Sequence, residues 1–501
     1  MSKSVVEFYP EREKHRCGYC KKPDSSCSQG MWAHQLTTDD YQNLIDRGWR
    51  RSGKYCYKPK MDETCCPLYT IKCNASGFKL SKSQKKLIKK MNKFLSKDND
   101  VEISENDEKS SVKINEQNQI PTPSQECDEQ TVLNTLRNKK HIQVDVNNLV
   151  PSSPREKTKN SELKDKKPEQ VENDKPLTVS EDISRIPSKK AKQLRLQRRQ
   201  EKCLLKGIDF DSKPKPNPNT GEKTLEEFLA DLPDGFRERL QIKLVRTAPA
   251  SPEWLASATA SYQLYIKYQV AIHGDKASEC TEDQFRRFLV KSPLQADFPD
   301  DGPSVGYGSF HQQYWLDGEL IAVGVIDILP KCVSSVYLFY NPNYSHLSLG
   351  TYGALIEVAF TRQLQVKTES IKSYYMGFYI HSCPKMRYKG NYSPSFLLCP
   401  ETYKWFPLEE CCKKLEQQPY CRLNPDVDAT DTDSCEKKDL LDILVLAGST
   451  YMTYGLYKEH KKRTGLRIRK STPQDTDEQI TLHYGKLVGK TTSQNMLLVK
   501  E

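Results

Sequence analysis

The sequence predicts an α/β fold, built around a strand pair, a glycine turn into a helix, and a further strand. Residues 320–329 are almost wholly apolar, and the apolar run 336–340 follows after a short connection, as in two buried strands that form a hairpin. After Tyr352 the apolar residues recur at helical spacing, so a helix begins near that position. The stretch 374–398 then adds another strand and a loop dense in aromatic and cationic residues.

Asp327 interrupts the first of these strands. With the period of two of a β-strand it shares a face with Val323 and Val325. An ionised carboxylate on an apolar face is costly unless hydrogen bonds or a cation offset its desolvation. Asp327 is therefore either a structural acid with its own partners or an acid that faces a site.

Gly350 and Gly353 flank the start of the predicted helix. A glycine turn that leads into a helix N-terminus places backbone amides where they bind anions. Glycines at such places also serve simply to make the turn. Both interpretations remain open from the residues alone.

Length and composition predict several domains and a segment without a core. A chain of 501 residues suggests two or three domains, and 36% hydrophobic residues with a mean hydropathy of -0.75 is low for one continuous globule. No run of 18 apolar residues occurs and the first residues lack an apolar signal core, so we expect neither a membrane span nor secretion. The 17 cysteines are then in a reducing compartment, which favours thiolate–metal chemistry over disulfides.

Residues 1–97 are predicted to form a small, basic, cysteine-rich domain with a helix at 38–46. Residues 1–95 hold 20 Lys and Arg against 9 Asp and Glu, an excess of 11 that equals that of the whole chain. Such charge suits a polyanion such as RNA, or it serves solubility. Six planar and cationic residues fit either stacking on unpaired bases or a small core; they are Trp32, Trp49, Arg50, Arg51, Tyr55 and Tyr57.

Four cysteines of this domain are candidate metal ligands. Cys17 and Cys20 form a CxxC pair, and Cys65 and Cys66 offer a second pair. Four thiolates suit tetrahedral zinc or an iron–sulfur cluster. Other cysteines of the domain are substitutes, and unmetallated buried thiols are the alternative.

The rest of the chain divides by composition. Residues 80–97 are predicted to form an amphipathic helix with seven Lys and no acid, which docks on its own domain, contacts a tRNA backbone or binds a membrane surface. Residues 98–209 contain no Phe, Tyr or Trp, so this insert is predicted to be mostly disordered. Residues 210–425 form the predicted catalytic domain, with helices at 225–232 and 252–274, and residues 426–501 are expected to complete it.

Four motifs carry a resemblance to a known family. They are 303–312 (PSVGYGSFHQ), 325–330 (VIDILP), 334–337 (SSVY) and 379–389 (YIHSCPKMRYK). In these residues the chain resembles the eukaryotic arginyl-tRNA-protein transferases. The resemblance covers the N-terminal cysteine region and roughly residues 251–408, and it leaves the segment between them unmatched.

The resemblance implies a fold, a reaction and a cofactor. The fold is similar to the N-acetyltransferase (GNAT) superfamily, with aminoacyl-tRNA in place of acyl-coenzyme A and no nucleotide cofactor. The reaction is transfer of arginine from Arg-tRNA to the α-amine of proteins that begin with Asp, Glu or oxidised Cys, which marks them for N-end-rule degradation. It further implies a [4Fe-4S] cluster on Cys17, Cys20, Cys65 and Cys66, with zinc as the alternative. We expect a monomer in the cytoplasm and nucleus.

The implied chemistry gives Asp327 a role. The donor is an activated ester, so correct placement of amine and carbonyl can supply roughly 7 to 11 kcal/mol, and one proton must be managed. A carboxylate near the α-amine can accept that proton or steer the ammonium. Asp327 is the predicted catalytic residue.

The remaining candidates bind the substrates. An acidic N-terminal residue requires a cation, and Lys385, Arg387 and Lys389 lie close together in the sequence, although each fits contact with the tRNA acceptor stem equally well. The other residues are expected to stack on the terminal adenine, to hydrogen-bond the ester or ribose, or to pack; they are His311, Gln312, Tyr337, Gly350, Gly353, Tyr379 and Tyr388.

Two other classes of function remain. A conventional acetyltransferase would carry a pyrophosphate loop of the form Q/R-x-x-G-x-G/A, and residues 346–353 lack that spacing, so only an atypical N-acetyltransferase remains as an alternative of this class. A non-catalytic tRNA-binding or iron–sulfur redox-sensing protein would bind tRNA through the N-terminal domain and leave the block 303–398 inert.

Overall fold

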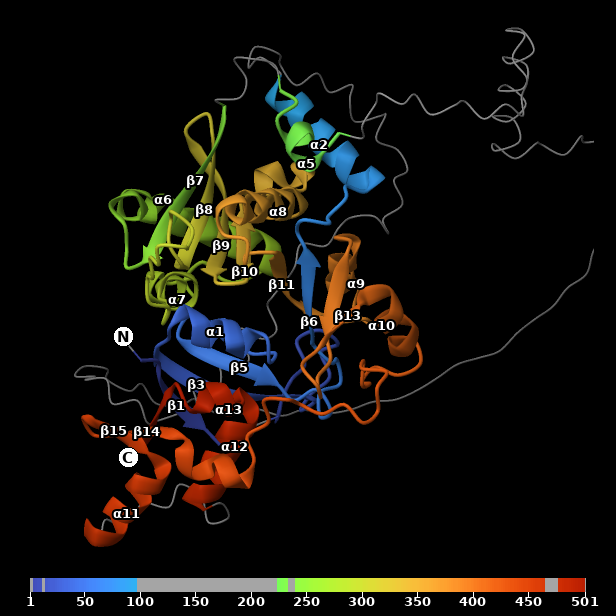
Figure 1. Cartoon of the computed structure of the whole chain (residues 1–501). Helices are drawn as coiled ribbons and strands as arrows, with labels where there is room; N and C mark the ends of the chain where they lie inside the picture. Colours follow the sequence, from blue (N-terminus) through green and yellow to red (C-terminus); the bar gives the residue numbers. More distant parts are fainter. Residues whose placement is uncertain (1–2, 11–13, 97–222, 233–238, 465–475, 501) are drawn as a thin grey trace, which may run out of the picture. The chain divides into compact units, whose positions relative to one another are not determined.

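The computed structural model describes residues 3–10, 14–96, 223–232, 239–464 and 476–500 (Figure 1). The predicted insert at 98–209 lies outside these residues. The described part contains α-helices and β-strands in two eight-stranded sheets, so the α/β class is confirmed. No helix in it is long and apolar enough to cross a lipid bilayer.

The first sheet, here called the N-terminal sheet, has the strand order β15-β14-β16-β1-β3-β5-β4, with β2 paired to β3. Its strands are β1 (Val5–Tyr9), β2 (Lys14–His15), β3 (Ser26–Gln35), β4 (Arg50–Ser52), β5 (Tyr55–Pro59), β14 (Leu444–Ala447), β15 (Thr450–Thr453) and β16 (Leu497–Lys500).

The second sheet, here called the central sheet, has the order β13-β12-β6-β11-β10-β9-β8-β7. Its strands are β6 (Tyr69–Asn74), β7 (Leu240–Ala248), β8 (Gly308–Leu316), β9 (Glu319–Leu329), β10 (Cys332–Tyr340), β11 (Ser373–Tyr379), β12 (Ser395–Leu398) and β13 (Trp405–Pro407).

Helices cover and connect the sheets. The α-helices are α1 (Thr38–Ile45), α2 (Lys82–Leu95), α5 (Leu225–Leu229), α6 (Pro252–Tyr268), α7 (Glu282–Phe285), α8 (Leu349–Lys367), α9 (Pro384–Arg387), α10 (Leu408–Leu415), α11 (Tyr454–Thr464), α12 (Asp477–Val488) and α13 (Lys490–Ser493). The short π and 3-10 turns are η3 (Gln269–His273), η4 (Arg286–Val290), η5 (Pro342–Leu347), η6 (Tyr388–Asn391) and η7 (Lys437–Asp442).

The predicted hairpin is the pair β9–β10, which is antiparallel as expected. Its long apolar run has a physical reason, since both faces of the central sheet are covered there. From β10, Tyr337 donates to the side chain of Gln269 just after α6, whereas Leu338 on the opposite face lies against Gly353 of α8. The helix predicted to begin near Tyr352 is α8, which begins three residues earlier, at Leu349.

Strand pairing does not follow the domain ranges expected from the sequence. β6 lies within residues 1–97 but is hydrogen bonded between β11 and β12 in the central sheet. β16 pairs with β1, so the C-terminal segment extends the N-terminal sheet and not the central sheet, as Figure 1 shows by the red and blue strands side by side. Strands join whichever partners cover their apolar faces, and composition along the chain does not reveal those partners.

The aromatic and cationic cluster of the N-terminal domain is mainly core. Trp49 and Tyr55 are buried, and Arg50 and Arg51 are only 6% exposed. Of the two interpretations of this cluster, the small core is therefore confirmed for these four residues. The basic helix predicted at 80–97 is α2, whose Ile88, Met91 and Leu95 are buried.

Candidate functional site

The candidate site lies where β10 and β11 separate. Their parallel pairing ends at Ser334 and Tyr375. β10 then has an irregularity between Ser335 and Tyr337, and β11 has one between Tyr375 and Phe378 that includes Gly377 at a φ of 67°. A positive φ is available to glycine at little cost, which lets β11 turn away from its neighbour. Two cavities open beside this gap, and they share Ser335, Val336 and Lys389.

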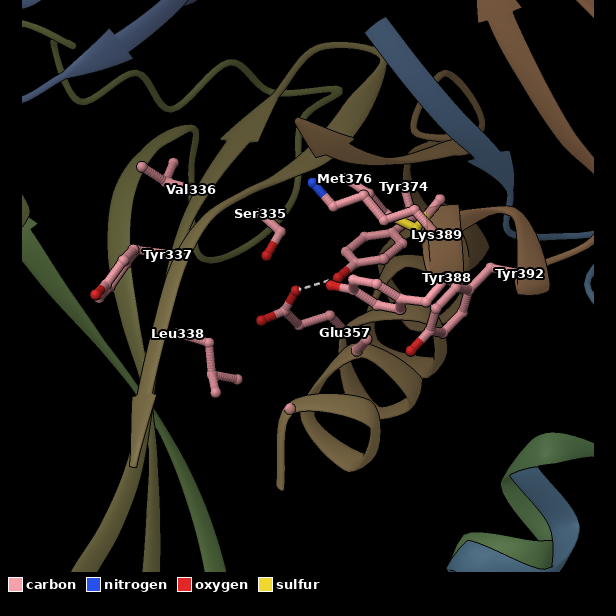
Figure 2. A pocket seen from close by; sticks show the side chains of 12 residues that line it. Ser335, Val336, Tyr337, Leu338, Glu357, Tyr374, Met376, Tyr388, Lys389 and Tyr392 are labelled. Atoms are coloured by element: carbon pink, nitrogen blue, oxygen red, sulfur yellow. Dashed lines mark hydrogen bonds between the residues drawn. The ribbon is translucent and has the colours of Figure 1, made fainter. Parts of the chain in front are cut away.

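The first cavity, here called the acidic cavity, lies between β10, α8 and the turn η6 (Figure 2). Its volume is about 50 Å³. Figure 2 shows the Glu357 carboxylate at its base and the tyrosine rings beside it. The lining residues are Ser335, Val336, Tyr337, Leu338, Gly350, Ala354, Glu357, Tyr374, Met376, Tyr388, Lys389 and Tyr392.

Glu357 is 1% exposed, and its two carboxylate oxygens differ. Oε2 accepts a hydrogen bond of 2.6 Å from the Tyr374 hydroxyl, whereas Oε1 has no hydrogen-bond partner of ordinary geometry in the described structure. Burial raises the pKa of this carboxyl to about 7, against the opposing effect of the Tyr374 and Ser335 hydroxyls. A buried acid of this kind exchanges its proton near neutral pH.

The second cavity, here called the basic cavity, lies on the other side of Ser335 and has a volume of about 30 Å³. Its walls combine three cations with tyrosine and phenylalanine rings. The lining residues are Tyr19, Tyr41, Arg50, Arg51, Ser52, Tyr57, Phe288, Ser334, Ser335, Val336, Gly377, Phe378, Met386 and Lys389.

Arg50 and Lys389 are held in this cavity by backbone carbonyls. Arg50 donates to the carbonyl oxygens of Trp49 at 2.6 Å and Gly377 at 3.4 Å, and Lys389 donates to that of Phe378 at 2.8 Å. The Arg50 Nε has no hydrogen-bond partner, and no ion pair in the described residues includes Arg50. Neutral carbonyls leave the charge of Arg50 uncompensated, so the cavity is suited to an anion.

Arg51 differs from Arg50 because its charge is matched by Asp327. Arg51 Nε and Nη2 donate to the two carboxylate oxygens at 2.8 and 2.6 Å, and the Ser309 hydroxyl adds a third bond at 2.6 Å. Burial lowers the pKa of Arg51, but the charge and hydrogen bonds of Asp327 outweigh it and raise that pKa above its usual value. Asp327 itself is fully buried and is not among the residues that line either cavity.

This geometry does not support the catalytic role predicted for Asp327. A general base must have an oxygen within reach of the proton it accepts. Both Asp327 oxygens already accept from a guanidinium, and neither is exposed. Of the two interpretations of the sequence, a structural acid with its own partners is the one that agrees with the structure.

The four predicted cysteine ligands come together. The Sγ atoms of Cys17, Cys20, Cys65 and Cys66 all lie within 4.8 Å of one another. The pKa of Cys20 is lowered to about 7, chiefly by a hydrogen bond from the Lys22 backbone. With Zn–S bonds near roughly 2.3 Å, a tetrahedral ion needs sulfur separations of about 3.8 Å, so these thiols fit a metal ion. In a cubane cluster each thiolate binds a different iron, which requires wider spacing.

His311 and Gln312 are inside the protein and not at a cavity. His311 is fully buried between the Trp254 indole at 3.3 Å and the Leu289 carbonyl at 2.9 Å, and burial lowers its pKa to about 4. Gln312 accepts from the Tyr314 hydroxyl at 2.6 Å. Their predicted contact with the ester or ribose is therefore not supported by their positions.

Three cations were predicted to bind an acidic N-terminal residue, and the structure does not bring them together. Lys389 is buried and lines both cavities, whereas Lys385 and Arg387 are exposed on α9. Arg387 lies 3.1 Å from His381 Nε2. Contact of Lys385 and Arg387 with the tRNA stays a prediction.

Of the other predicted residues, Tyr337, Gly350 and Tyr388 line the acidic cavity. Tyr379 instead pairs with His381 Nδ1 at 2.9 Å, and Gly353 allows close packing, because a Cβ there would lie 2.6 Å from Leu338 Cδ1.

Sequence reasoning missed Glu357 and gave Arg50 no role in a cavity. Glu357 has a visible signal, since it is the one acid in the apolar segment 349–360. Arg50 lies in a different part of the sequence from the rest of the site, and only the fold brings β4 to β11.

Comparisons with known proteins agree with the motifs. A family model described as "Arginine-tRNA-protein transferase, N terminus" matches residues 15–86, and one described as "Arginine-tRNA-protein transferase, C terminus" matches residues 260–399. These ranges include the four cysteines and both sides of the separated strands.

One curated relative covers the whole length of the chain, and others cover parts of it. The chain is 42% identical to the Drosophila melanogaster "Arginyl-tRNA--protein transferase 1", with 100% of each chain covered. It is 34% identical to the Arabidopsis thaliana "Arginyl-tRNA--protein transferase 2", over 82% of this chain and 76% of that one. It is 32% identical to the "Aspartate/glutamate leucyltransferase" of Pseudomonas fluorescens, over 36% of this chain and 63% of that one.

A solved structure gives only a weak similarity. The C-terminal DUF2156 domain of a putative lysylphosphatidylglycerol synthetase from Agrobacterium fabrum matches with a TM-score of 0.18 and 14% identity, over 29% of this chain and 37% of that chain. This similarity is too low to assign the fold.

Proposed function

This chain belongs to the arginyl-tRNA–protein transferase family, and we propose that its acceptors are proteins whose N-terminal residue is Asp, Glu or oxidised Cys. Transfer of arginine from tRNA to protein is the activity of the family. The choice of acidic acceptors, and the marking of those proteins for N-end-rule degradation in cytoplasm and nucleus, are the proposed part.

The reaction depends more on positioning the acceptor amine and the ester carbonyl than on activating either group. The acceptor α-amine attacks the ester carbonyl, an amide N–C bond forms, and the bond to the 3′ oxygen of the terminal adenosine breaks. The amine loses one proton and the ribose oxygen gains one, so no proton is consumed overall. Because the ester is already reactive, holding the two groups in contact supplies most of the rate.

One observation supports the acidic acceptor above all: the basic cavity holds an Arg50 charge that no acid of the described structure neutralises. A carboxylate entering the cavity would meet the Arg50 guanidinium, which has no ion-pair partner among the described residues. Charge-assisted bonds of this kind are about twice as strong as neutral ones. Lys389 lies in the same wall and adds to the positive potential.

In this scheme Asp327 is a positioning residue. It fixes the Arg51 guanidinium through two hydrogen bonds, and Arg51 in turn lines the basic cavity. The central sheet supports a GNAT-like arrangement in which α8 packs beside the separated β10 and β11, and the reacting groups would meet at their shared wall.

We propose further that Cys17, Cys20, Cys65 and Cys66 hold a metal centre, as the proximity of their Sγ atoms supports. Zinc fits the present spacing, and a [4Fe-4S] cluster would require the thiolates to move apart. Such a centre supplies stability to the loop that carries Tyr19, a wall residue of the basic cavity. Anaerobic purification with absorption and metal analysis distinguishes the two.

The test supplies labelled Arg-tRNA and two peptides that differ only in an N-terminal Asp or Ala. We expect label on the Asp peptide alone. Label on neither peptide would exclude the transferase function in favour of a non-catalytic tRNA-binding protein, and equal label on both would exclude the acidic selection.

The basic cavity is tested by Arg50→Gln, with Arg239→Gln as the control. Arg239 pairs with Asp317 away from the cavity, at the turn between β8 and β9. We expect Arg50→Gln to raise KM for the Asp peptide by about 10- to 100-fold, since a charge-assisted pair contributes about 1.5–3 kcal/mol. Arg239→Gln should leave KM unchanged, and equal effects of the two variants would contradict the assignment.

A further inference from the structure

Glu357 is a buried acid, and only one of its two carboxylate oxygens has a hydrogen-bond partner. It lies in the middle of α8, on a face whose neighbours Leu355 and Val358 are fully buried. Its Oε1 has no hydrogen-bond partner, and no ion pair in the described residues includes Glu357. Burying a carboxylate without a directly paired cation is costly, and partial protonation offsets that cost here; Lys389 lines the same cavity without an ion pair to Glu357. The fold therefore leaves one oxygen of this acid able to accept hydrogen bonds from a ligand.

The space at Oε1 is built into the sheet. Gly324 of β9 lies directly beneath this oxygen, and a Cβ at that position would be 2.7 Å from it. Any larger residue would therefore push the carboxylate out of place. Figure 2 shows the Ser335 hydroxyl on the opposite wall pointing toward the carboxylate.

The walls suit a chain that is apolar along its length and cationic at its end. The rings of Tyr374, Tyr388 and Tyr392 gather on one side of the cavity, and Leu338 and Ala354 line the other parts. Aromatic faces attract cations, and a carboxylate binds a guanidinium through two parallel hydrogen bonds. The cavity volume of about 50 Å³ is more than one water molecule needs, so it has room for a small head group.

We propose that the acidic cavity binds the guanidinium of the arginyl group carried by the tRNA, and that Glu357 is the residue that selects it. This inference rests on the proposed transferase function and names the donor pocket of the same site. Ser335 separates Glu357 from the basic cavity. The donor side chain and the acidic acceptor side chain are thus drawn to opposite sides of one wall, and their reacting carbonyl and amine meet beside it.

The first test measures binding without chemistry. The probes are 3′-arginylamino-3′-deoxyadenosine, which carries an amide in place of the ester, and its citrulline counterpart, whose urea has the same shape without the charge. Calorimetry with the full chain should show the arginyl probe binding on the order of 100-fold more tightly. Glu357→Gln should reduce that preference to below about 10-fold.

The matched control is Glu319→Gln, at the far end of β9. Glu319 pairs with Asn341 and Tyr344 and lines neither cavity. It should keep the full preference. A wild-type chain without preference, or a Glu357→Gln chain that keeps it, would overturn the proposal.

A second measurement needs no variant. At pH 7 a carboxyl with a pKa of about 7 is partly protonated, so a cationic ligand should expel protons that the citrulline probe does not. The groups that face Glu357 do not obscure this, because burial raises the pKa of Tyr314, Tyr374, Tyr388 and Tyr392, and Lys389 is the nearby cation. Equal proton release by the two probes, measured in buffers of different ionisation enthalpy, would exclude the proposal.

The transfer assay separates this inference from the function on which it rests. If the wild-type chain transfers no arginine to the Asp peptide, the transferase function fails. If it does, and Glu357→Gln keeps the ratio of kcat/KM for arginyl-tRNA over citrullyl-tRNA, only the assignment of Glu357 fails.

Discussion

Glu357 makes the stability of the fold depend on pH in the direction opposite to a salt-bridged carboxyl. Its pKa is raised to about 7 in the folded chain, so between about pH 4.5 and 7 the folded state binds more protons than the unfolded state. The free energy of unfolding therefore falls as pH rises through this window, by at most about 3 kcal/mol.

We therefore predict that Glu357→Gln removes this fall in the free energy of unfolding as pH rises. Urea unfolding at pH 5 and pH 7 should show a smaller pH dependence for the variant than for the wild type, and no loss of stability at pH 7. A variant that is much less stable at pH 7 would show that the carboxylate serves the fold and not a ligand.

Replacing Asp327, unlike replacing Glu357, should destabilise the fold, because the Asp327 carboxylate is paired with the Arg51 guanidinium. Asp327→Asn leaves the buried Arg51 without a counter-charge, and we expect a loss of about 3–5 kcal/mol in the free energy of unfolding. Replacing both residues together, Asp327→Leu with Arg51→Met, should recover much of that loss. Denaturant unfolding measures both, and an unchanged Asp327→Asn variant would contradict the structural role.

These two acids show what a sequence reveals at this scale. Asp327 stands out because alternation along a strand is short and regular, but the pattern cannot say whether Arg51, 276 positions away, supplies its counter-charge. Glu357 lies in a helix, where one acid among apolar residues is an ordinary feature of a partly exposed face. Its importance follows only from its burial.

At the scale of elements, the turn between β4 and β5 positions the basic cavity. Gly53 has a φ of 58°, and a Cβ there would lie 1.9 Å from the Arg287 carbonyl oxygen of η4. Arg51 Nη1 also donates to the Gly53 carbonyl at 3.2 Å. The turn therefore fixes Arg51 only while it packs closely on η4.

Gly53→Ala should disrupt this packing. The control is Gly318→Ala, since Gly318 also has a positive φ, 87°, but nothing lies within 4 Å of its added Cβ. We expect the control to lose about 1–2 kcal/mol from backbone strain alone, and Gly53→Ala to lose more and to raise KM for the acidic peptide. Equal stability and equal KM in the two variants would show that the turn does not position the cavity.

The helix and strand elements themselves were largely predictable. The hairpin β9–β10, the amphipathic α2 and the helices α1 and α6 follow from periodicity, which is local. The gap between β10 and β11 could not be predicted from the sequence. It depends on where pairing stops between two strands, and α8 lies between those strands in the sequence.

At the scale of the whole molecule, the cysteines that we propose hold a metal pack against residues of the basic cavity. Cys17 and Cys66 pack with Phe378 and Met386, which also line the basic cavity. Removing the metal with a chelator should therefore raise KM for the acidic peptide several-fold while KM for Arg-tRNA changes little. If both constants change equally, or neither changes, the metal centre does not act through this pocket.

Taken alone, the sequence determined the family, the α/β class, the four cysteines and the existence of an anomalous buried acid. Each of these is carried by residues close together in the chain or by motifs long enough to be specific. Only the tertiary structure decided that β6 joins the central sheet, that Arg51 neutralises Asp327, and that Arg50 and Glu357 lie in adjoining cavities. The physical reason is that charge compensation and cavity formation depend on which distant segments pack together, and composition and periodicity do not encode that choice locally.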